Sequence, residues 1–202
     1  MSAAVQARDR RAERRAATRA EILDAAWDLV RADGLAALAM RGLGARVGMR
    51  AQSLYAYFPA KHAIYDAMFA DSTRQVLDRL TNQPPLDDPV DRLRRLARVF
   101  LGFCVEDPVR YQLLFQRTIP GFEPGPQSYA LAVQALDHGR RALADCGITG
   151  GRALDTFTGL LAGLAAQQNA NEPGGDRWVR LVDEVMDMFL TRYPPAQGRQ
   201  QQ

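Results

Sequence analysis

Residues 39–61 constrain the fold of this chain more than any other stretch, because they predict two short helices joined by a tight corner. Residues 41–47 and 51–58 each carry a pair of apolar side chains four positions apart, which places each pair on one face of a helix. Gly48 separates the two helices and tolerates the positive φ that often ends a helix. Pro59 then disfavours helical backbone at the residue before it. The pattern predicts a helix-turn-helix, in which the second helix enters the DNA major groove.

The side chains that point away from this corner suit contact with DNA. Gln52 can form two hydrogen bonds with a purine, and Ala51 or Ser53 can lie against a thymine methyl group. Tyrosine hydroxyls and Lys61 can reach phosphates. The predicted DNA-binding residues are Met40, Arg41, Arg50, Ala51, Gln52, Ser53, Tyr55, Tyr57 and Lys61. The competing interpretation is a purely structural corner whose tyrosines pack on their neighbours.

Residues 35–69 also resemble the DNA-binding domain of the tetracycline-repressor (TetR) family of bacterial transcriptional regulators. The resemblance is carried by the run Leu-Tyr-Ala-Tyr-Phe-Pro-Ala-Lys at 54–61, by Gly48, and by the preceding helix that ends at Gly34. It implies an all-α homodimer. Each subunit would have an N-terminal three-helix helix-turn-helix DNA-binding domain and a C-terminal helical ligand-binding and dimerisation domain.

The chain has 202 residues, which is long enough for such an arrangement. Residues 1–70 hold eleven basic and seven acidic side chains, so this end is the one expected to meet nucleic acid. Four segments are predicted: a basic flexible arm at 1–18, a helix-turn-helix domain at 19–70, a helical regulatory and dimerisation domain at 71–195, and a disordered tail at 196–202. The arginines of the arm either stay solvated or touch phosphates or a minor groove beside the main contact.

Residue counts argue against catalytic and metal-binding functions. His62 and His138 are the only histidines, and neither belongs to a cluster with metal-ligand spacing. The chain has no G-x-S-x-G elbow and no Walker A motif, so we predict neither an enzyme nor a cofactor. Cys104 and Cys146 are far apart and are expected to be reduced and buried, which indicates a cytoplasmic protein. No apolar run reaches the ~20 residues that a membrane span needs.

The rest of the chain shows helical periodicity only, and its last two predicted helices suit dimerisation. The predicted helices outside the corner are 19–33, 61–80, 90–106, 108–117, 127–145, 150–170 and 177–193. The helix at 150–170 has a face of small residues that permits close approach, and the helix at 177–193 has more apolar surface than one partner covers. They either fill the monomer core or form a four-helix interface between subunits. The predicted interface residues are Gly159, Ala162, Gly163, Trp178, Leu181, Val185 and Phe189.

Aromatic residues of the middle helices suggest a small-molecule site. An apolar cavity with a few polar groups is the usual form of such a site, although the same residues also suit a closed core. The predicted pocket residues are Phe100, Phe103, Tyr111, Phe115, Phe122, Tyr129, His138, Phe157 and Gln167. With the resemblance, these features predict a sequence-specific DNA-binding repressor, released from a palindromic operator by a small, largely apolar effector. The alternatives are a helical ligand-binding protein without specific DNA binding and a ligand-independent DNA binder.

Overall fold

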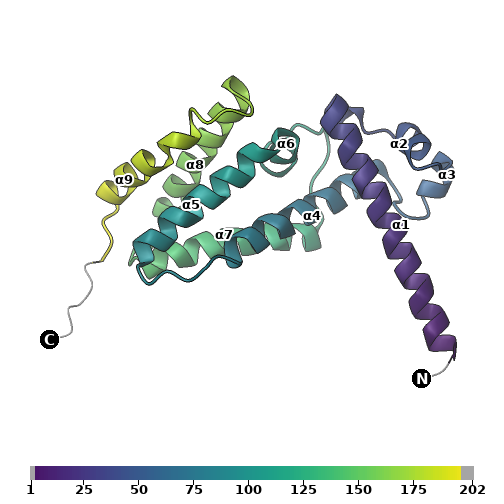
Figure 1. Cartoon of the computed structure of the whole chain (residues 1–202), viewed down its shortest axis with the longest axis horizontal. Coiled ribbons are helices and arrows are strands. Elements are labelled where there is room, and N and C mark those ends of the chain that lie inside the picture. The colour runs from purple at the N-terminus through teal and green to yellow at the C-terminus, as the bar shows by residue number, and fades with distance from the viewer. Residues whose placement is uncertain (1–2, 197–202) are drawn as a thin grey trace. The chain divides into compact units, whose positions relative to one another are not determined.

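The computed structural model of the chain describes residues 3–196 and contains only helices and their connections within that range (Figure 1). The α-helices are α1 (Ala3–Asp33), α2 (Met40–Arg46), α3 (Ala51–Leu54), α4 (Lys61–Thr81), α5 (Pro89–Glu106), α6 (Pro108–Phe115), α7 (Pro126–Asp145), α8 (Gly151–Asn171) and α9 (Val182–Arg192). Two 3-10 helices are interspersed, η1 (Leu35–Ala37) and η2 (Val179–Leu181). The predicted all-α fold is confirmed. Among the described helices, none has the length and apolar character that crossing a bilayer requires.

The chain divides into two compact units that are not contiguous in sequence. The first unit comprises residues 1–71 and 112–128, and the second comprises residues 72–111 and 129–202. The first division falls near the predicted domain boundary, but the sequence does not indicate that residues 112–128 join the N-terminal unit. Residues 197–202 of the predicted tail lie outside the described part of the chain.

Helix α1 begins at Ala3, whereas the sequence predicts a flexible arm at 1–18 and a helix only from residue 19. The added turns consist mainly of alanine, arginine and glutamate, which are strong helix formers even where no apolar periodicity marks them. Thr18 therefore lies inside the helix, where its hydroxyl donates to the Arg14 carbonyl at 3.1 Å. The structure thus differs from the prediction in extending α1 through residues 3–18.

The first unit is built on a small apolar core between α1 and the helix-turn-helix. Ile22 and Val30 of α1 are fully buried, as are Leu43 of α2 and Leu54 of α3. Helix α1 packs against η1 and α2, and α2 packs against α3. The apolar pairs that predict the corner are thus the side chains that hold it, with Phe58 closing the core at 1% exposure.

Residues 112–128 complete the first unit by packing on the start of α4. The Phe122 ring lies 5.6 Å from the Tyr65 ring and 6.0 Å from the His62 ring, measured between centroids. The Gly125 amide donates to the Asp66 carboxylate at 2.7 Å. Tyr65 is fully buried, its hydroxyl donates to the Leu35 carbonyl, and burial raises its pKa to about 12. The first turns of α4 are therefore held on two sides within this unit.

The second unit is a helical body in which α5 packs against α8 and α9. The N-terminus of α5 is stabilised by Asp88, whose side chain caps the helix by accepting hydrogen bonds from the amides of Val90 and Asp91. Pro89 occupies the first turn, where its missing N–H is not needed. Both cysteines are buried and free. The predicted final helix at 177–193 is shorter than expected, since η2 precedes α9 and only residues 182–192 are α-helical.

Candidate nucleic-acid interface

The helix-turn-helix corner depends on two glycines that serve different purposes. Gly48 has φ +66°, in the left-handed region that side chains other than glycine rarely adopt, as the sequence predicts. Gly44 lies where the backbone folds back on itself, and its carbonyl accepts from the Met49 amide at 2.8 Å. A Cβ atom at Gly44 would stand 2.6 Å from the Met49 carbonyl oxygen and 3.3 Å from the Ala51 nitrogen. Sequence reasoning missed this requirement, because a glycine inside a helix has no periodic signal.

Helix α3 starts at Ala51, as predicted, but ends at Leu54 instead of continuing to Phe58. Beyond it, the Ala56 and Tyr57 amides donate to carbonyls three residues back, so the backbone tightens into turns. The Phe58 amide still reaches the Leu54 carbonyl at 2.8 Å. Pro59 follows and prevents further helix.

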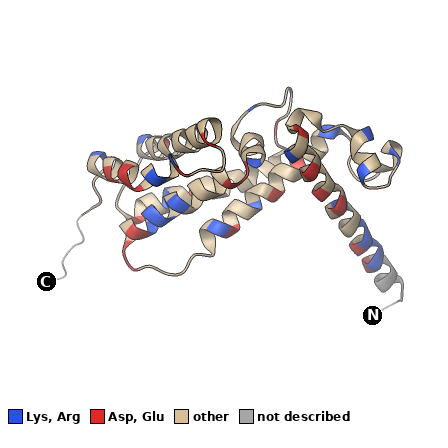
Figure 2. Cartoon of the chain, turned by 45° about the horizontal axis from the view of Figure 1, so that its top comes forward, with Lys and Arg blue, Asp and Glu red and all other residues tan. Residues whose placement is uncertain are grey.

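The residues at the start of α3 are available to a partner. Arg50, Gln52 and Ser53 are exposed and Ala51 is half-buried. At the start of α2, Arg41 is exposed and Met40 is half-buried; no side chain caps this helix, since Ala39 stands before it. The exposed members of this set, Arg41, Arg50, Gln52 and Ser53, are all polar and are here called the rim of the corner. Figure 2 shows arginine and lysine residues in blue.

The predicted phosphate-binding residues differ in their exposure and in the contacts that they already make within the first unit. Tyr55 is 52% exposed, so its hydroxyl is free to reach outward. Tyr57 is half-buried, with the Arg15 guanidinium 5.1 Å from its ring centroid. Lys61 is also half-buried, and its Nζ lies 3.5 Å from the Ala36 carbonyl oxygen and 5.4 Å from the Tyr65 ring centroid.

Two arginines of α1 brace the turn that follows α3. Arg15 donates to the Ala56 carbonyl. Arg19 donates to the Tyr57 carbonyl, and its guanidinium stacks over the Phe58 ring at 4.0 Å. These bonds satisfy carbonyls that no longer pair within a helix. Sequence reasoning had no signal for this role, because both residues belong to a run of arginines.

The predicted dimer residues fall into two groups. Gly159, Ala162 and Gly163 are exposed on one face of α8, while Leu181 and Val185 are half-buried. Met188, which the prediction omits, is 62% exposed. Trp178 is half-buried, and its amide donates to the Gln168 side chain at 2.8 Å. Phe189 is 2% exposed and its ring meets the Phe157 ring edge to face, 5.6 Å apart between centroids, so it belongs to the core of the second unit and not to an exposed face.

The predicted pocket residues are divided between the two units. Phe115 and Phe122 belong to the first unit, and the others belong to the second. Within the second unit, Phe157 packs on Phe189, and Tyr129 is 59% exposed. The exposed Gln167 accepts from Asn171 at 2.7 Å, and Phe100 is half-buried. His138 is half-buried, and desolvation, followed by the Arg141 charge, lowers its pKa. Phe103 and Tyr111 remain as buried aromatics next to a polar network.

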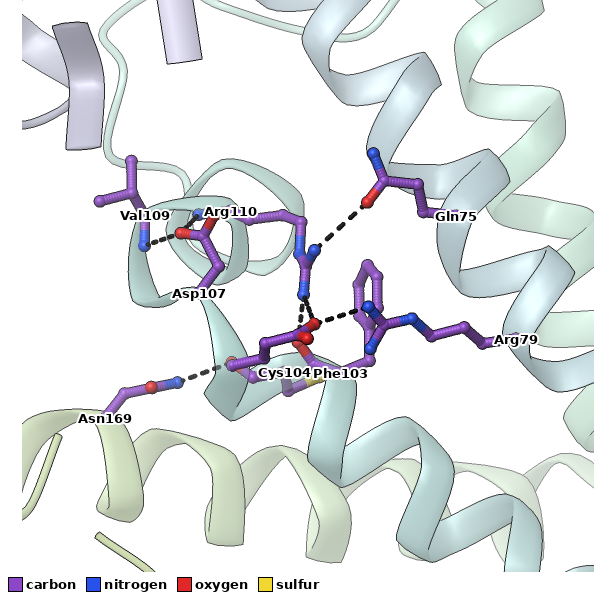
Figure 3. A network of polar contacts seen from close by, with 9 residues as sticks. Gln75, Arg79, Phe103, Cys104, Asp107, Val109, Arg110 and Asn169 are labelled. Carbon is purple, nitrogen blue, oxygen red and sulfur yellow. Dashed lines mark hydrogen bonds and ion pairs between the residues drawn. The ribbon is translucent and has the colours of Figure 1, made fainter. Parts of the chain in front are cut away.

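That network centres on Arg110, which is only 6% exposed (Figure 3). Its Nη2 donates to the Phe103 carbonyl and to Glu106, both at 2.8 Å, and its Nη1 donates to Gln75 at 3.2 Å. Glu106 also pairs with Arg79 of α4 at 2.7 Å. The hydrogen bond from Arg110 is the main reason that the pKa of Glu106 is lowered. The network thus ties α4 to α5 and α6 within the second unit.

Three polar atoms in this part of the second unit are buried without a hydrogen-bond partner among the described residues. Two of them are Arg110 Nε and the hydroxyl oxygen of Ser72, which is fully buried on α4. Asn169 donates to the Cys104 carbonyl at 3.1 Å, but its Oδ1 likewise lacks a partner there. Burial raises the pKa of Cys104 to about 12. Buried polar atoms of this kind call for an explanation, such as a bound water or ligand.

Comparison with known proteins points to one kind of protein. Residues 22–68 match the model of the bacterial regulatory proteins of the tetR family. The helix-turn-helix transcriptional regulator Mb1846 of Mycobacterium bovis is 25% identical over 100 residues, covering 48% of this chain and 43% of that protein. Rv1816 of Mycobacterium tuberculosis matches with the same identity and coverage. The match therefore spans less than half the length of these relatives.

Solved structures extend the similarity over most of the fold. The regulatory protein SCO4313 has a TM-score of 0.74 at 22% identity, covering 89% of this chain and 98% of that one. PfmR, a TetR family transcriptional regulator from Thermus thermophilus, has a TM-score of 0.64 at 18% identity, with 87% and 99% coverage. FadR, a fatty acid degradation regulator from Bacillus halodurans, has a TM-score of 0.66 at 15% identity, with 91% and 97% coverage. At such identities the likeness concerns the fold alone.

Proposed function

Because this chain belongs to the TetR family of bacterial regulatory proteins, we propose that it is a sequence-specific DNA-binding repressor of transcription that works as a homodimer. The observation that carries the proposal is the rim of exposed Arg50, Gln52 and Ser53 on a corner whose apolar side chains are buried. In a helix-turn-helix, these positions of the second helix lie against base edges.

The roles divide by chemistry and by exposure. Gln52, with Arg50, Ala51 and Ser53, contacts bases, since an amide can bond adenine at two atoms. Arg41 and Tyr55 hold phosphates from exposed positions. Tyr57 and Lys61 contribute less freely, because each already contacts a neighbour within the unit. Met40 then serves as an apolar neighbour of the phosphate contacts.

The dimer uses the exposed faces of α8 and α9. Gly159, Ala162 and Gly163 leave α8 without bulk, so that a second helix can approach closely. Val185 and Met188 of α9 lie near one another on the helix surface and supply the apolar contact. A two-fold arrangement presents two α3 helices to two half-sites, which predicts a pseudo-palindromic operator.

The effector site lies within the second unit, beside Phe103, Tyr111 and Arg110. It is supported by the buried Arg110 Nε and Ser72 hydroxyl, which would gain partners from a ligand. The effector is then small and largely apolar, with one acceptor atom for Arg110 Nε. Helix α4 crosses the boundary between the units, because residues 61–71 belong to the first unit and the rest of the helix to the second. A ligand that displaces Gln75 and Arg79 would therefore also displace the part of α4 that belongs to the first unit. Effector and operator would therefore oppose each other by linkage.

Two experiments test these proposals. In the first, the protein selects duplexes from a random library, and the selected site is compared with unselected DNA in mobility shifts. Failure to enrich any site would favour the alternative of a helical ligand-binding protein. In the second, a thermal-shift screen of small molecules is followed by tests for release of the selected duplex. Ligands that stabilise the protein without releasing DNA would favour a ligand-independent DNA binder. A hit should lose most of its effect with Arg110→Lys, which keeps the charge but lacks Nε.

A further inference from the structure

We propose that residues 9–18 of α1, here called the α1 extension, form a second DNA contact that binds backbone phosphates beside the base pairs read by α3. The inference rests on the proposed function, because it assumes that the corner faces DNA. It adds a distinct surface and a distinct set of base pairs to those contacted by the helix-turn-helix.

The α1 extension is helical but buries almost none of its own surface. All side chains from Asp9 to Ala17 are exposed. Ten helical residues span about 15 Å, and these turns run on past α2 and α3 (Figure 1). The segment carries four arginines and two acidic residues, a net charge of +2. Hydrophobic burial therefore does not account for it, and charge is its main chemical property.

Two of the four arginines, Arg11 and Arg15, lie opposite the acids, whereas Arg10 lies nearer to the acidic side. At 100° per residue, Arg11 and Arg15 fall on the same side of α1 as the buried Ile22, further along the helix. Asp9 and Glu13 fall roughly opposite. The face of α1 that is buried at Ile22 therefore carries arginines, not apolar residues, in the α1 extension. Figure 2 shows the basic residues gathered along these turns.

The contact of Arg15 shows where this face is directed. Arg15 donates to the Ala56 carbonyl and stacks over the Tyr57 ring at 5.1 Å. It therefore touches the turn that directly follows α3, beside one of the predicted phosphate-binding residues. Arg11 stands one helical turn further out on that face, and Arg14 is on its edge. Both are exposed.

The occupant that fits this surface is the DNA backbone. A duplex held by α3 carries one negative charge for about every 1.7 Å of its axis, so phosphates continue on both sides of the base pairs that α3 reads. From Arg15, which touches the recognition turn, to Asp9 the basic face extends about 9 Å, which would cover about 3 base pairs of flanking DNA. Arg11 and Arg14 are the contacting residues, and Arg15 is a positioning residue that fixes the extension against the turn.

The test compares Arg11→Ala/Arg14→Ala with Arg140→Ala/Arg141→Ala, which removes two exposed arginines from α7 in the second unit. Alanine is the better helix former, so circular dichroism should show no loss of helix in either variant. Each protein is titrated with two duplexes, the site selected by the wild-type protein with long flanks and a random-sequence duplex, over a range of salt. Hydroxyl-radical footprints are taken on the selected site.

For Arg11→Ala/Arg14→Ala we expect the slope of log affinity against log salt to fall by about 1.8 per half-site, and by a similar amount on random DNA. The footprint should shorten by about 3 base pairs at each outer end, with the base preference unchanged. An unchanged slope and footprint would overturn the inference, as would an equal loss in the α7 variant, which would indicate a general charge effect. If the wild-type protein selected no site, the proposed function would fail, and the slope on random DNA would still decide the inference.

Discussion

Gly44→Ala should damage the helix-turn-helix although it adds only one methyl group to a helix. The new Cβ would stand 2.6 Å from the Met49 carbonyl oxygen, where carbon and oxygen in contact are usually about 3.3 Å apart. The corner must therefore open by about 0.7 Å. Crowding of this kind costs about 1–3 kcal/mol. Alanine in place of glycine within a helix returns about 0.5–1 kcal/mol.

Gly42→Ala is the matched control, because it lies in the same helix and would gain the same helix propensity. Its Cβ would meet only the Leu29 Cδ1 atom, at 3.7 Å, which is ordinary contact. The difference between the two variants thus isolates the clash at about 1–3 kcal/mol. For a chain of this size each kcal/mol shifts Tm by about 2–4 °C.

The assays are thermal unfolding, followed by circular dichroism, and mobility shift on the selected operator. Gly42→Ala should melt at or slightly above the wild-type temperature and bind the operator as the wild type does. Gly44→Ala should melt a few degrees lower and lose affinity, since opening the corner displaces the start of α3. Equal melting temperatures and equal affinities for the two variants would refute the argument from the Gly44 contact.

Three further predictions concern bases, subunits and pH. Gln52→Ala should relax preference at one base pair of each half-site by about 1–3 kcal/mol, whereas Lys61→Ala should weaken all duplexes alike; the reverse pattern in binding assays would contradict these roles. Met188→Glu changes an exposed side chain, so it should leave the helix content intact and yield monomers in analytical ultracentrifugation; a surviving dimer would place the interface elsewhere. The lowered pKa of Glu106 means that its ion pairs stabilise the fold above pH about 4.5 and lose that effect as pH falls. Urea unfolding of Glu106→Gln should therefore depend less on pH on the acid side than unfolding of the wild type.

The sequence predicts the corner well because the corner is local. Apolar pairs four residues apart, Gly48 and Pro59 all act within a few residues, so their meaning does not depend on distant partners. The bounds of α4, predicted at 61–80 and found at Lys61–Thr81, have the same origin. The start of α1 is not predicted from the sequence, because an exposed helix rich in alanine and arginine has no periodic pattern of apolar residues.

The interface and the pocket depend on which helices pack against one another, and the periodicity of apolar residues does not specify those tertiary contacts. The apolar face of the last helix is visible in the sequence, but the sequence does not show that Phe189 is buried against the α8 residue Phe157. The division of the predicted pocket residues between the two units is not visible in the sequence either, since Tyr111 and Phe115 are only four residues apart and belong to different units. Gly44 and Arg19 are needed for contacts with backbone atoms, which leave no pattern in side-chain types.

The discontinuous make-up of the first unit limits how this protein can be recombined. A chimera joined within α4 near residue 71 would take His62 and Tyr65 away from the Phe122 ring, and would leave Asp66 without the Gly125 amide. The transplanted piece would then expose an aromatic side chain that is fully buried in the intact chain. A functional graft has to carry two separate stretches, the N-terminal residues and the connection between α6 and α7. Among related proteins, substitutions in that connection should therefore co-vary with substitutions in the N-terminal part of the first unit, although the connection lies between two helices of the second half of the chain.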